Sequence, residues 1–307
     1  MNELVELYDK PLAEEIYMLA GWQQWADAGA VSSGLPPYLI ERTRARKIGE
    51  IKSESFYLYQ VPGAHHLFRP TIKLENGYRK ELQHPKNEFF YTGERQRGLV
   101  IFTGIEPHLG IQPYAAAFFD AAKQLGVRRV ITVGGVYGAT PYDKDRDISC
   151  VYSLPRMKEE MTKYAVKFSN YEGGVSIGSY LADRAERENM EYCSLYAFVP
   201  AYDFSQQSQQ MQGFAIDHDF KAWYDLMRRL NHMFNLSIDL SDLDRRSDEL
   251  ISSMDTKIDE LDRTMPQLKA REYMNRLAKN FNETSFMPLD DVWSSELEDI
   301  FKNLGDL

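Results

Sequence analysis

The chain has 307 residues, of which 43% are hydrophobic, and a formal net charge of −10 at pH 7. This length suits one large α/β domain with an accessory element, or two domains. The negative charge argues against sequence-independent binding of nucleic acid and against docking on an anionic membrane. No apolar run approaches the ~20 residues of a membrane span. Two cysteines, Cys150 and Cys193, are too few for a disulfide scaffold, so we expect a cytoplasmic protein.

The first hundred residues predict a strand, a helix and then several short strands. Residues 15–20 form the first strand, and Asp27 stands where the N-cap of a helix over residues 28–42 would lie. Pro36-Pro37 inside this helix predicts a kink or a break, because proline lacks the backbone N–H and clashes with the preceding turn. Short strands follow at residues 47–53, 55–61, 71–74, 78–82 and 88–92. Asn76-Gly77 predicts an antiparallel hairpin, which would make the sheet mixed.

Residues 97–140 read as a strand–helix–strand unit. The runs at residues 99–102 and 130–133 are apolar throughout, as expected of strands that are buried on both faces. A right-handed crossover would place Gly104 and Gly134-Gly135 at neighbouring strand ends. Ligands usually bind at that edge of an open α/β sheet.

After residue 140 the predicted strands and helices continue to alternate, and from residue 217 onward only helices are predicted. A strand at 148–153, a helix at 156–164, a helix at 175–189 and a strand at 192–199 complete a layered α/β domain over residues 1–216. Residues 217–281 predict a C-terminal helical region, with helices at 217–235, at 241–263 and from Pro266 to 281. The last two form a hairpin with arms of roughly 30 Å. It either packs on its own sheet or presents an apolar stripe to another protein or subunit. Residues 282–307 form an acidic tail.

Two glycine pairs could take part in ligand binding. Gly134-Gly135 follows a strand, as a phosphate-cradling loop would, and Tyr137 comes two residues later. Gly173-Gly174 opens a helix, and helix N-termini attract anions. Neither pair matches a nucleotide-binding fingerprint. The alternative is that these glycines only permit tight turns between strands and helices.

Acid–base chemistry has one weak candidate pair. Glu106 and His108 are two residues apart at a strand end, so they could share a face and exchange protons, or they could lie on a solvated turn. His65-His66 does not predict a metal site, because adjacent side chains of an extended chain point to opposite faces. No serine elbow or cysteine signature is present. We therefore expect no metal and no cofactor.

Three segments resemble the PAC2 family, the proteasome assembly chaperone 2-like proteins. They are Gly21-Trp22 followed by Ala26-Asp27-Ala28-Gly29, then Val61-Pro62-Gly63, then Val133-Gly134-Gly135-Val136 with Tyr137. The resemblance covers residues 15–235. It implies a three-layer, phosphorylase/hydrolase-like α/β fold with a mixed central sheet. It also implies a cytoplasmic homo-oligomer, commonly a trimer, and no established enzymatic activity for most members.

The same resemblance implies a role in proteasome assembly for characterised relatives, some of which dock through a C-terminal hydrophobic-Tyr-any tripeptide. This chain ends Gly305-Asp306-Leu307, so it departs from the family at that point.

Two functions follow from these observations. The first is a non-enzymatic assembly or protein-interaction protein that binds a protein partner or itself. The second is a binding protein or a hydrolase or phosphorylase for a small nucleoside-like molecule at the glycine-lined strand ends. In the second, Asp27 would orient or deprotonate the substrate, Glu106 and His108 would exchange protons, and Tyr137 would stack on a base. The predicted ligand-binding residues are Trp22, Asp27, Gly104, Gly134, Gly135, Tyr137, Gly173 and Gly174.

Overall fold

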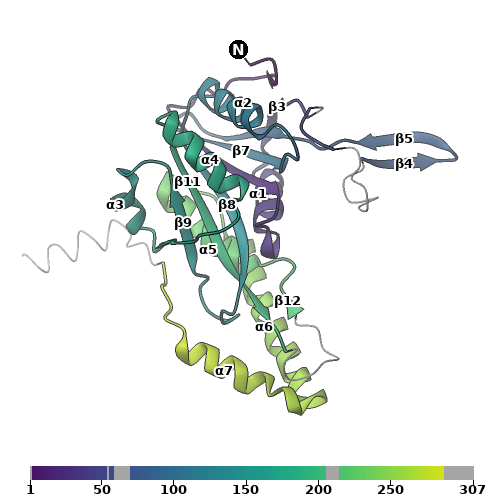
Figure 1. Ribbon diagram of the computed structural model, residues 1–307, viewed down its shortest axis with the longest axis vertical. Helices are drawn as coiled ribbons and strands as arrows, with labels where there is room; N and C mark the ends of the chain where they lie inside the picture. The colour runs from purple at the N-terminus through teal and green to yellow at the C-terminus, as the bar shows by residue number, and fades with distance from the viewer. Residues whose placement is uncertain (1, 54, 59–69, 205–213, 287–307) are drawn as a thin grey trace, which may run out of the picture.

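The computed structural model describes residues 2–53, 55–58, 70–204 and 214–286 (Figure 1). The strands are β1 (Val5–Leu7), β2 (Glu15–Gln23), β3 (Arg46–Ile51), β4 (Thr71–Glu75), β5 (Tyr78–Gln83), β6 (Glu88–Gly93), β7 (Arg97–Ile105), β8 (Val127–Gly138), β9 (Ile148–Tyr152), β10 (Lys167–Phe168), β11 (Glu191–Tyr202) and β12 (Phe214–Ala215). The helices are α1 (Val31–Thr43), α2 (Ile111–Gln124), α3 (Met157–Thr162), α4 (Ile177–Arg187), α5 (Phe220–Phe234), α6 (Ser241–Thr264) and α7 (Ala270–Asn280).

The central sheet is mixed, as the sequence predicts. Ten strands follow the order β1-β3-β6-β7-β2-β8-β11-β9-β10, with β12 paired to β11. The four central strands β7, β2, β8 and β11 are parallel, whereas β6, β3, β1 and β9 join antiparallel. Both edges are short, because β1 has three residues and β10 has two.

The strand order corrects one expectation about the glycines. The strand–helix–strand unit is present as β7, α2 and β8, but β2 lies between the two strands. Gly104 therefore pairs with Trp22 of β2, and Gly134 pairs with Tyr196 of β11. The connection from β7 to β8 passes over one strand, because the apolar β2 lies between them in the centre of the sheet. Gly104 and Gly134 are not at neighbouring strand ends.

Two further strand predictions differ from the structure. The hairpin at Asn76-Gly77 forms, but β4 and β5 make a separate two-stranded sheet and do not supply the antiparallel strands of the central one. Within the predicted strand at 55–61, the described residues 55–58 are not extended in a sheet. The buried Phe56 instead fixes this segment, and its carbonyl accepts the backbone N–H groups of His108 and Leu109.

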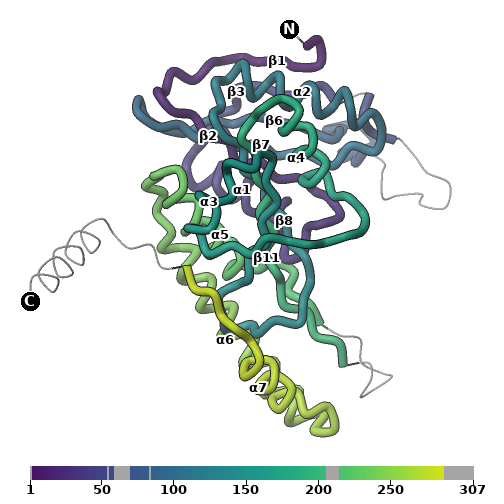
Figure 2. Tube along the Cα trace, turned by 60° about the vertical axis from the view of Figure 1, so that its left-hand side comes forward, coloured from purple at the N-terminus to yellow at the C-terminus, as the bar shows by residue number. Residues whose placement is uncertain are grey.

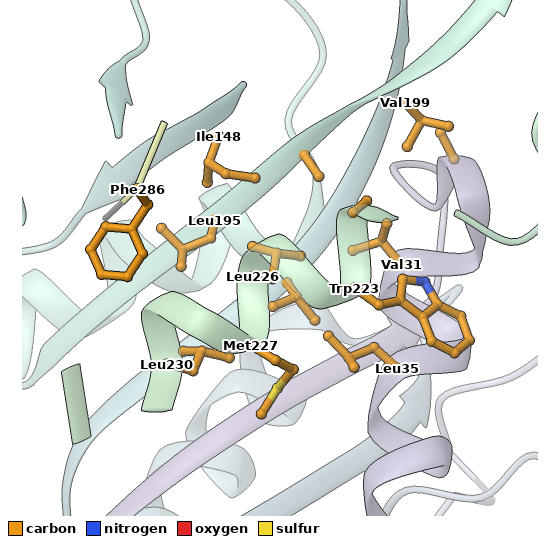
Figure 3. Packing of buried hydrophobic residues seen from close by; sticks show 14 of the residues in the cluster. Val31, Leu35, Ile148, Leu195, Val199, Trp223, Leu226, Met227, Leu230 and Phe286 are labelled. Atoms are coloured by element: carbon orange, nitrogen blue, oxygen red, sulfur yellow. The ribbon is translucent and has the colours of Figure 1, made fainter. Parts of the chain in front are cut away.

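Alternate side chains of each central strand enter cores on opposite faces of the sheet. On β2, Leu19 packs with α1 and α5, whereas Met18 and Ala20 pack with α2 and α4. This period of two follows from strand geometry and produces three layers. Figure 3 shows the first core, where Leu195 of β11 faces Leu226 and Leu230 of α5.

Helix α1 runs unbroken through Pro36-Pro37, so the predicted break is absent. The helix is pressed onto β2, where a Cβ at Gly21 would lie 2.1 Å from the carbonyl oxygen of Ser32 and 2.7 Å from Pro36 Cγ. The buried side chains of Leu35 and Leu39 hold this face in the core. Tertiary packing therefore outweighs the local cost of the two prolines.

The C-terminal helices continue the core on one face of the sheet. Helix α5 is held by Trp223, whose indole N–H donates to the carbonyl of Gly29 at 3.1 Å, and α6 packs on α5 through the buried Leu243 and Ile258. Figure 2 shows α6 and α7 beside each other below the sheet.

The hairpin arms predicted at the C-terminus are unequal. At 1.5 Å per residue, the 24 residues of α6 span about 36 Å and the 11 residues of α7 about 17 Å. The last helix also starts later than predicted. Pro266 opens a separate 3-10 turn, and Lys269 has a left-handed backbone before α7 begins. Within 2–53, 55–58, 70–204 and 214–286, no helix has the length and apolarity needed to cross a membrane.

Candidate functional site

The loop after β2 lies directly on the Gly134-Gly135 pair. Asp27 forms a parallel bridge with Gly135, and the N–H of Gly135 donates to the carbonyl of Ala26 at 2.9 Å. A Cβ at Gly135 would lie 1.9 Å from the carbonyl oxygen of Ala28. Glycine is therefore required here for close approach of two backbone segments. Because its N–H is already used, Gly135 cannot cradle a phosphate in this conformation.

Asp27 holds the start of α1. Its Oδ1 accepts the backbone N–H groups of Ser32 and Ser33 at 2.8 and 2.9 Å. Burial raises the pKa of the Asp27 carboxyl, and the hydrogen bonds from Ser33 oppose that shift. The predicted capping role is thus performed from a position three residues before the formal N-cap, Ala30. A catalytic role for Asp27 remains a prediction.

The predicted acid–base pair is engaged with two different loops. Glu106 Oε2 accepts the backbone N–H of Trp25 at 3.3 Å, and His108 Nδ1 accepts that of Leu58 at 3.1 Å. Burial lowers the pKa of His108, and the nearby carboxylate of Glu106 opposes the shift. Gly104 lines a cavity of about 430 Å³ whose lining includes Lys86 but neither Glu106 nor His108.

Trp22 and Trp25 have opposite surroundings although they are three residues apart. Trp22 is completely buried, and its indole N–H donates to the hydroxyl of Tyr114 at 2.8 Å. Trp25 is 71% exposed. The side chain of Trp22 belongs to the aromatic core with Phe102 and Phe118, so a ligand at the strand ends meets Trp25 first.

Exposed rings surround a cavity of about 300 Å³ beside the carboxyl ends of β8 and β11. We call Trp25, Tyr137, Tyr171 and Val175 the aromatic patch; their exposed fractions are 71%, 54%, 67% and 64%. Three of them line the cavity, and Val175 stands between two lining residues. The lining consists of Trp25, Ala26, Val136, Tyr137, Ser149, Val151, Ser169, Tyr171, Gly174, Ser176, Ser179, Tyr196 and Phe198.

The polar groups of this cavity are hydroxyls. Ser176 Oγ and the Tyr196 hydroxyl are 2.5 Å apart, and Ser179 Oγ lies 3.3 Å from the same hydroxyl. Ser176 also caps α4 by accepting the N–H of Ser179. No carboxylate, imidazole, amine or guanidinium is among these lining residues. The cavity can hold an apolar group, and its serine and tyrosine hydroxyls can hydrogen-bond to a polar atom beside that group.

The structure brings together some of the predicted ligand-binding residues and separates others. Tyr137 and Gly174 line the cavity, and Gly134 lies beneath it, where a Cβ would meet the ring of Tyr196 at 2.7 Å. Gly173 contacts Tyr171 at the rim. Trp22 and Gly104 lie elsewhere. Binding by any of these residues remains a prediction.

A metal site has no support in the described residues. Among residues 2–53, 55–58, 70–204 and 214–286, no three His, Cys, Asp or Glu side chains come together as possible ligands. His65-His66, the second segment of the family resemblance and the chain terminus lie outside the described residues.

The PAC2 family model matches residues 21–257, which is most of the chain. The chain belongs to the PAC2 family. A search of the curated proteins found no match.

Solved structures agree with this fold. A PAC2 family protein from Streptomyces avermitilis is 24% identical, with a TM-score of 0.66 over 84% of this chain and 99% of that one. A proteasome-assembly chaperone homologue from Mycobacterium tuberculosis is 21% identical, with a TM-score of 0.67 over 79% and 95% of the two chains. An archaeal proteasome activator from Pyrococcus furiosus is 22% identical, with a TM-score of 0.59 over 83% and 99%.

In this PAC2 chain, sequence reasoning missed Trp25, Tyr171 and Tyr196. Trp25 sits in Gln23-Gln24-Trp25, after the apolar run of β2 has ended, and Tyr171 lies between polar residues of a loop. A large ring in a polar loop at a strand end is the signal that could have identified them. Tyr196 lies within a buried strand, and its sequence gives no such sign.

Proposed function

We propose that this chain is a non-enzymatic protein-interaction protein with an assembly-chaperone-like role, and that the aromatic patch binds a partner polypeptide. The carrying observation is that Trp25, Tyr137 and Tyr171 are each more than half exposed around one cavity. Aromatic residues are enriched at the centres of protein interfaces, and clustered apolar exposure marks interaction sites.

The chemistry of the cavity supports a side-chain receptor. Its volume of about 300 Å³ is at the lower end of the range for ligand pockets. Ser176 and Tyr196 offer hydroxyls to a peptide group, and the rings offer apolar surface. We expect the partner to insert an aromatic or aliphatic side chain.

The family relatives support an assembly role. The Mycobacterium tuberculosis structure is described as a proteasome-assembly chaperone homologue, and the Pyrococcus furiosus protein as a proteasome activator. We therefore propose that the partner is a subunit of a multi-subunit complex, that the chain works in the cytoplasm, and that it forms homo-oligomers.

A second candidate is a binding protein for a nucleoside-like molecule. It is favoured by the same cavity, in which Tyr137 and Trp25 could stack on a planar base. The engaged N–H of Gly135 and the uncharged lining count against a phosphorylated ligand.

Photo-crosslinking in cells tests the proposal. A photoreactive phenylalanine analogue is placed at Tyr171 and, in separate chains, at Tyr137 and at the control position Leu12, which is 92% exposed outside the patch. We expect one protein to crosslink from both patch positions and not from position 12, and the crosslink to disappear in Trp25→Ala.

Two results would count against a protein-binding patch. One is crosslinking from Tyr171 and Tyr137 that does not exceed that from position 12. The other is a rise in melting temperature with nucleosides, lost in Tyr137→Ala, which would establish the small-molecule alternative instead. A bound ligand stabilises the folded state by mass action, so such a rise is readily measured.

A further inference from the structure

Ser149 carries a buried hydroxyl without a hydrogen-bond partner. It lies on β9 directly opposite Tyr196 of β11, and both residues line the cavity beside the aromatic patch. Ser149 is 8% exposed, and its Oγ makes no hydrogen bond within the part of the chain that the structure describes. A buried hydroxyl costs free energy unless water or a ligand satisfies it. Ser149 can therefore donate a hydrogen bond to a group bound in the cavity.

The N-terminus of α4 faces the same cavity. Ser176 caps this helix and Ser179 belongs to its first turn, and both line the cavity. The first N–H groups of a helix have no acceptor within the helix, and its aligned peptide dipoles leave partial positive charge at this end. Helix N-termini accordingly bind carboxylates and phosphates. The helix and the hydroxyl of Ser149 are separate features of the cavity, and both favour an anionic group.

The charge of the lining decides between these two anions. The hydroxyls of Ser176 and Tyr196 are 2.5 Å apart, so one donates to the other and the accepting hydroxyl keeps its own hydrogen for a further acceptor. The lining therefore supplies hydroxyl donors, but no lysine, arginine or histidine is among its residues. A carboxylate with one negative charge suits such a site better than a phosphate group, which carries nearly two.

The rest of the lining is mainly apolar. Val151 and Phe198 line the cavity, and the exposed rings of the aromatic patch surround it. Its volume of about 300 Å³ is at the lower end of the range for ligand pockets, so it suits one large residue and not a longer segment. The ligand that fits combines an aromatic side chain with a single carboxylate.

We infer that the cavity captures the C-terminal residue of a partner polypeptide, with its carboxylate at Ser149 and the N-terminus of α4. The inference rests on the proposed function, because it names the part of the partner that enters the cavity. A chain terminus is the place where a polypeptide carries a carboxylate and an aromatic side chain on the same residue. The aromatic patch outside the cavity contacts the residues that precede this terminus.

Two peptides that differ only at the terminus test the inference. They are a fluorescein-labelled Gly-Ser-Gly-Ser-Phe with a free carboxyl group and the same peptide with a C-terminal amide. Fluorescence anisotropy should give a dissociation constant below about 1 mM for the acid. The amide should bind about tenfold more weakly or worse, because it has no charge to accept hydrogen bonds from the hydroxyls and from α4.

Ser149→Ala shows whether the cavity recognises the carboxylate. This variant should weaken binding of the acid about tenfold and leave binding of the amide unchanged, so the ratio of their affinities falls. Tyr196→Phe should act in the same direction. Ser253→Ala is the matched control, because this serine is exposed on α6, and it should change neither affinity. Circular dichroism checks that each variant is folded.

The photo-crosslink from Tyr171 tests the inference in cells. Mass spectrometry of the crosslinked product should identify the C-terminal peptide of the partner. A crosslink to an internal segment of the partner would leave the proposed function intact and overturn capture of a terminus.

Three further results would overturn the inference. One is equal affinity for the acid and the amide, and another is an affinity ratio that Ser149→Ala does not change. The third is binding of the acid peptide without any crosslink above that from position 12. That combination would show that the cavity takes a small aromatic acid, and the proposed function would fail with the inference.

Discussion

The Asp27 side chain can be interpreted as a structural helix cap or as a catalytic carboxylate, and experiments can distinguish the two. Its Oδ1 accepts two backbone N–H groups at the start of α1, and burial raises the pKa of its carboxyl. The first property makes it a structural cap. The second is also expected of a buried catalytic carboxylate.

The pH dependence of stability distinguishes wild type from Asp27→Asn. Because the folded pKa of Asp27 lies above its ordinary value of 3.8, the folded state binds the proton more tightly than the unfolded state. The protonated Asp27 carboxyl therefore adds to the free energy of unfolding. This contribution is fully present below about pH 3.8 and is lost as the pH rises through the raised pKa of the folded state. An asparagine side chain at this position keeps the accepting oxygen without the buried charge. We expect the free energy of unfolding of Asp27→Asn, relative to wild type, to increase as pH rises from 3.5 to 7 in urea titrations.

Asp27→Ala is the matched control. It removes the acceptor for both N–H groups and should destabilise the protein by about 1 kcal/mol at pH 7. A constant difference between Asp27→Asn and wild type across this pH range would show that the carboxyl is not perturbed.

Residue patterns also set the limit of what could be predicted about the site. Gly134, Gly135 and Tyr137 were predicted to bind a ligand because glycines after an apolar strand have a restricted set of roles, and of the three only Tyr137 lines the cavity. The exposed Trp25 was overlooked in favour of the buried Trp22, since exposure depends on where β2 leaves the sheet. Hydroxyls such as Ser176 and Tyr196 meet only through the pairing of distant segments.

The elements themselves were largely predictable, and their arrangement was less so. Continuous apolar runs gave β7, β8 and β11, and helical periodicity gave α5 and α6. These are local signals. The position of β2 between β7 and β8 was missed because strand pairing depends on contacts between segments far apart in the chain. The same holds for the unbroken α1, which the packing of Leu35 and Leu39 stabilises against its prolines.

Helix α5 is tied to the loop between β8 and β9 by a fully buried ion pair. Arg146 Nε donates to Asp219 Oδ2 at 2.8 Å, and both side chains are 0% exposed. Asp219 also caps α5 by accepting the N–H of Ala222. We expect Asp219→Ala to lower the free energy of unfolding by about 3–5 kcal/mol, because it leaves the Arg146 charge buried without its partner.

An exposed pair on α4 provides the comparison. Asp183 and Arg187 lie 3.0 Å apart with side chains 54% and 66% exposed. Asp183→Ala should change the free energy of unfolding by less than about 1 kcal/mol. Equal losses in the two variants, measured by urea unfolding, would contradict the structural role of the buried pair.

The whole molecule is expected to unfold as one unit that includes its C-terminal helices. Ile258 of α6 is 0% exposed and belongs to the same core as Leu19 of β2 and Trp223 of α5. We expect Ile258→Ala to lower the free energy of unfolding by about 2–5 kcal/mol. Tryptophan fluorescence and far-ultraviolet circular dichroism should shift together and share one midpoint.

Two separate midpoints would show instead that residues 217–281 fold independently, as a domain of their own. Leu12→Ser serves as the control, since this side chain is 92% exposed and should not move either midpoint.

The short edges of the central sheet have a consequence for behaviour at high concentration. Long free edges recruit strands from other molecules, which leads to fibrils and precipitates. Here one edge is the three-residue β1 and the other is the two-residue β10, where Lys167 adds a charge. The central sheet therefore offers few free backbone groups for adding strands from other molecules. Any thioflavin-binding aggregate that forms in a concentrated solution should start from the separate β4–β5 sheet and not from the edges of the central sheet.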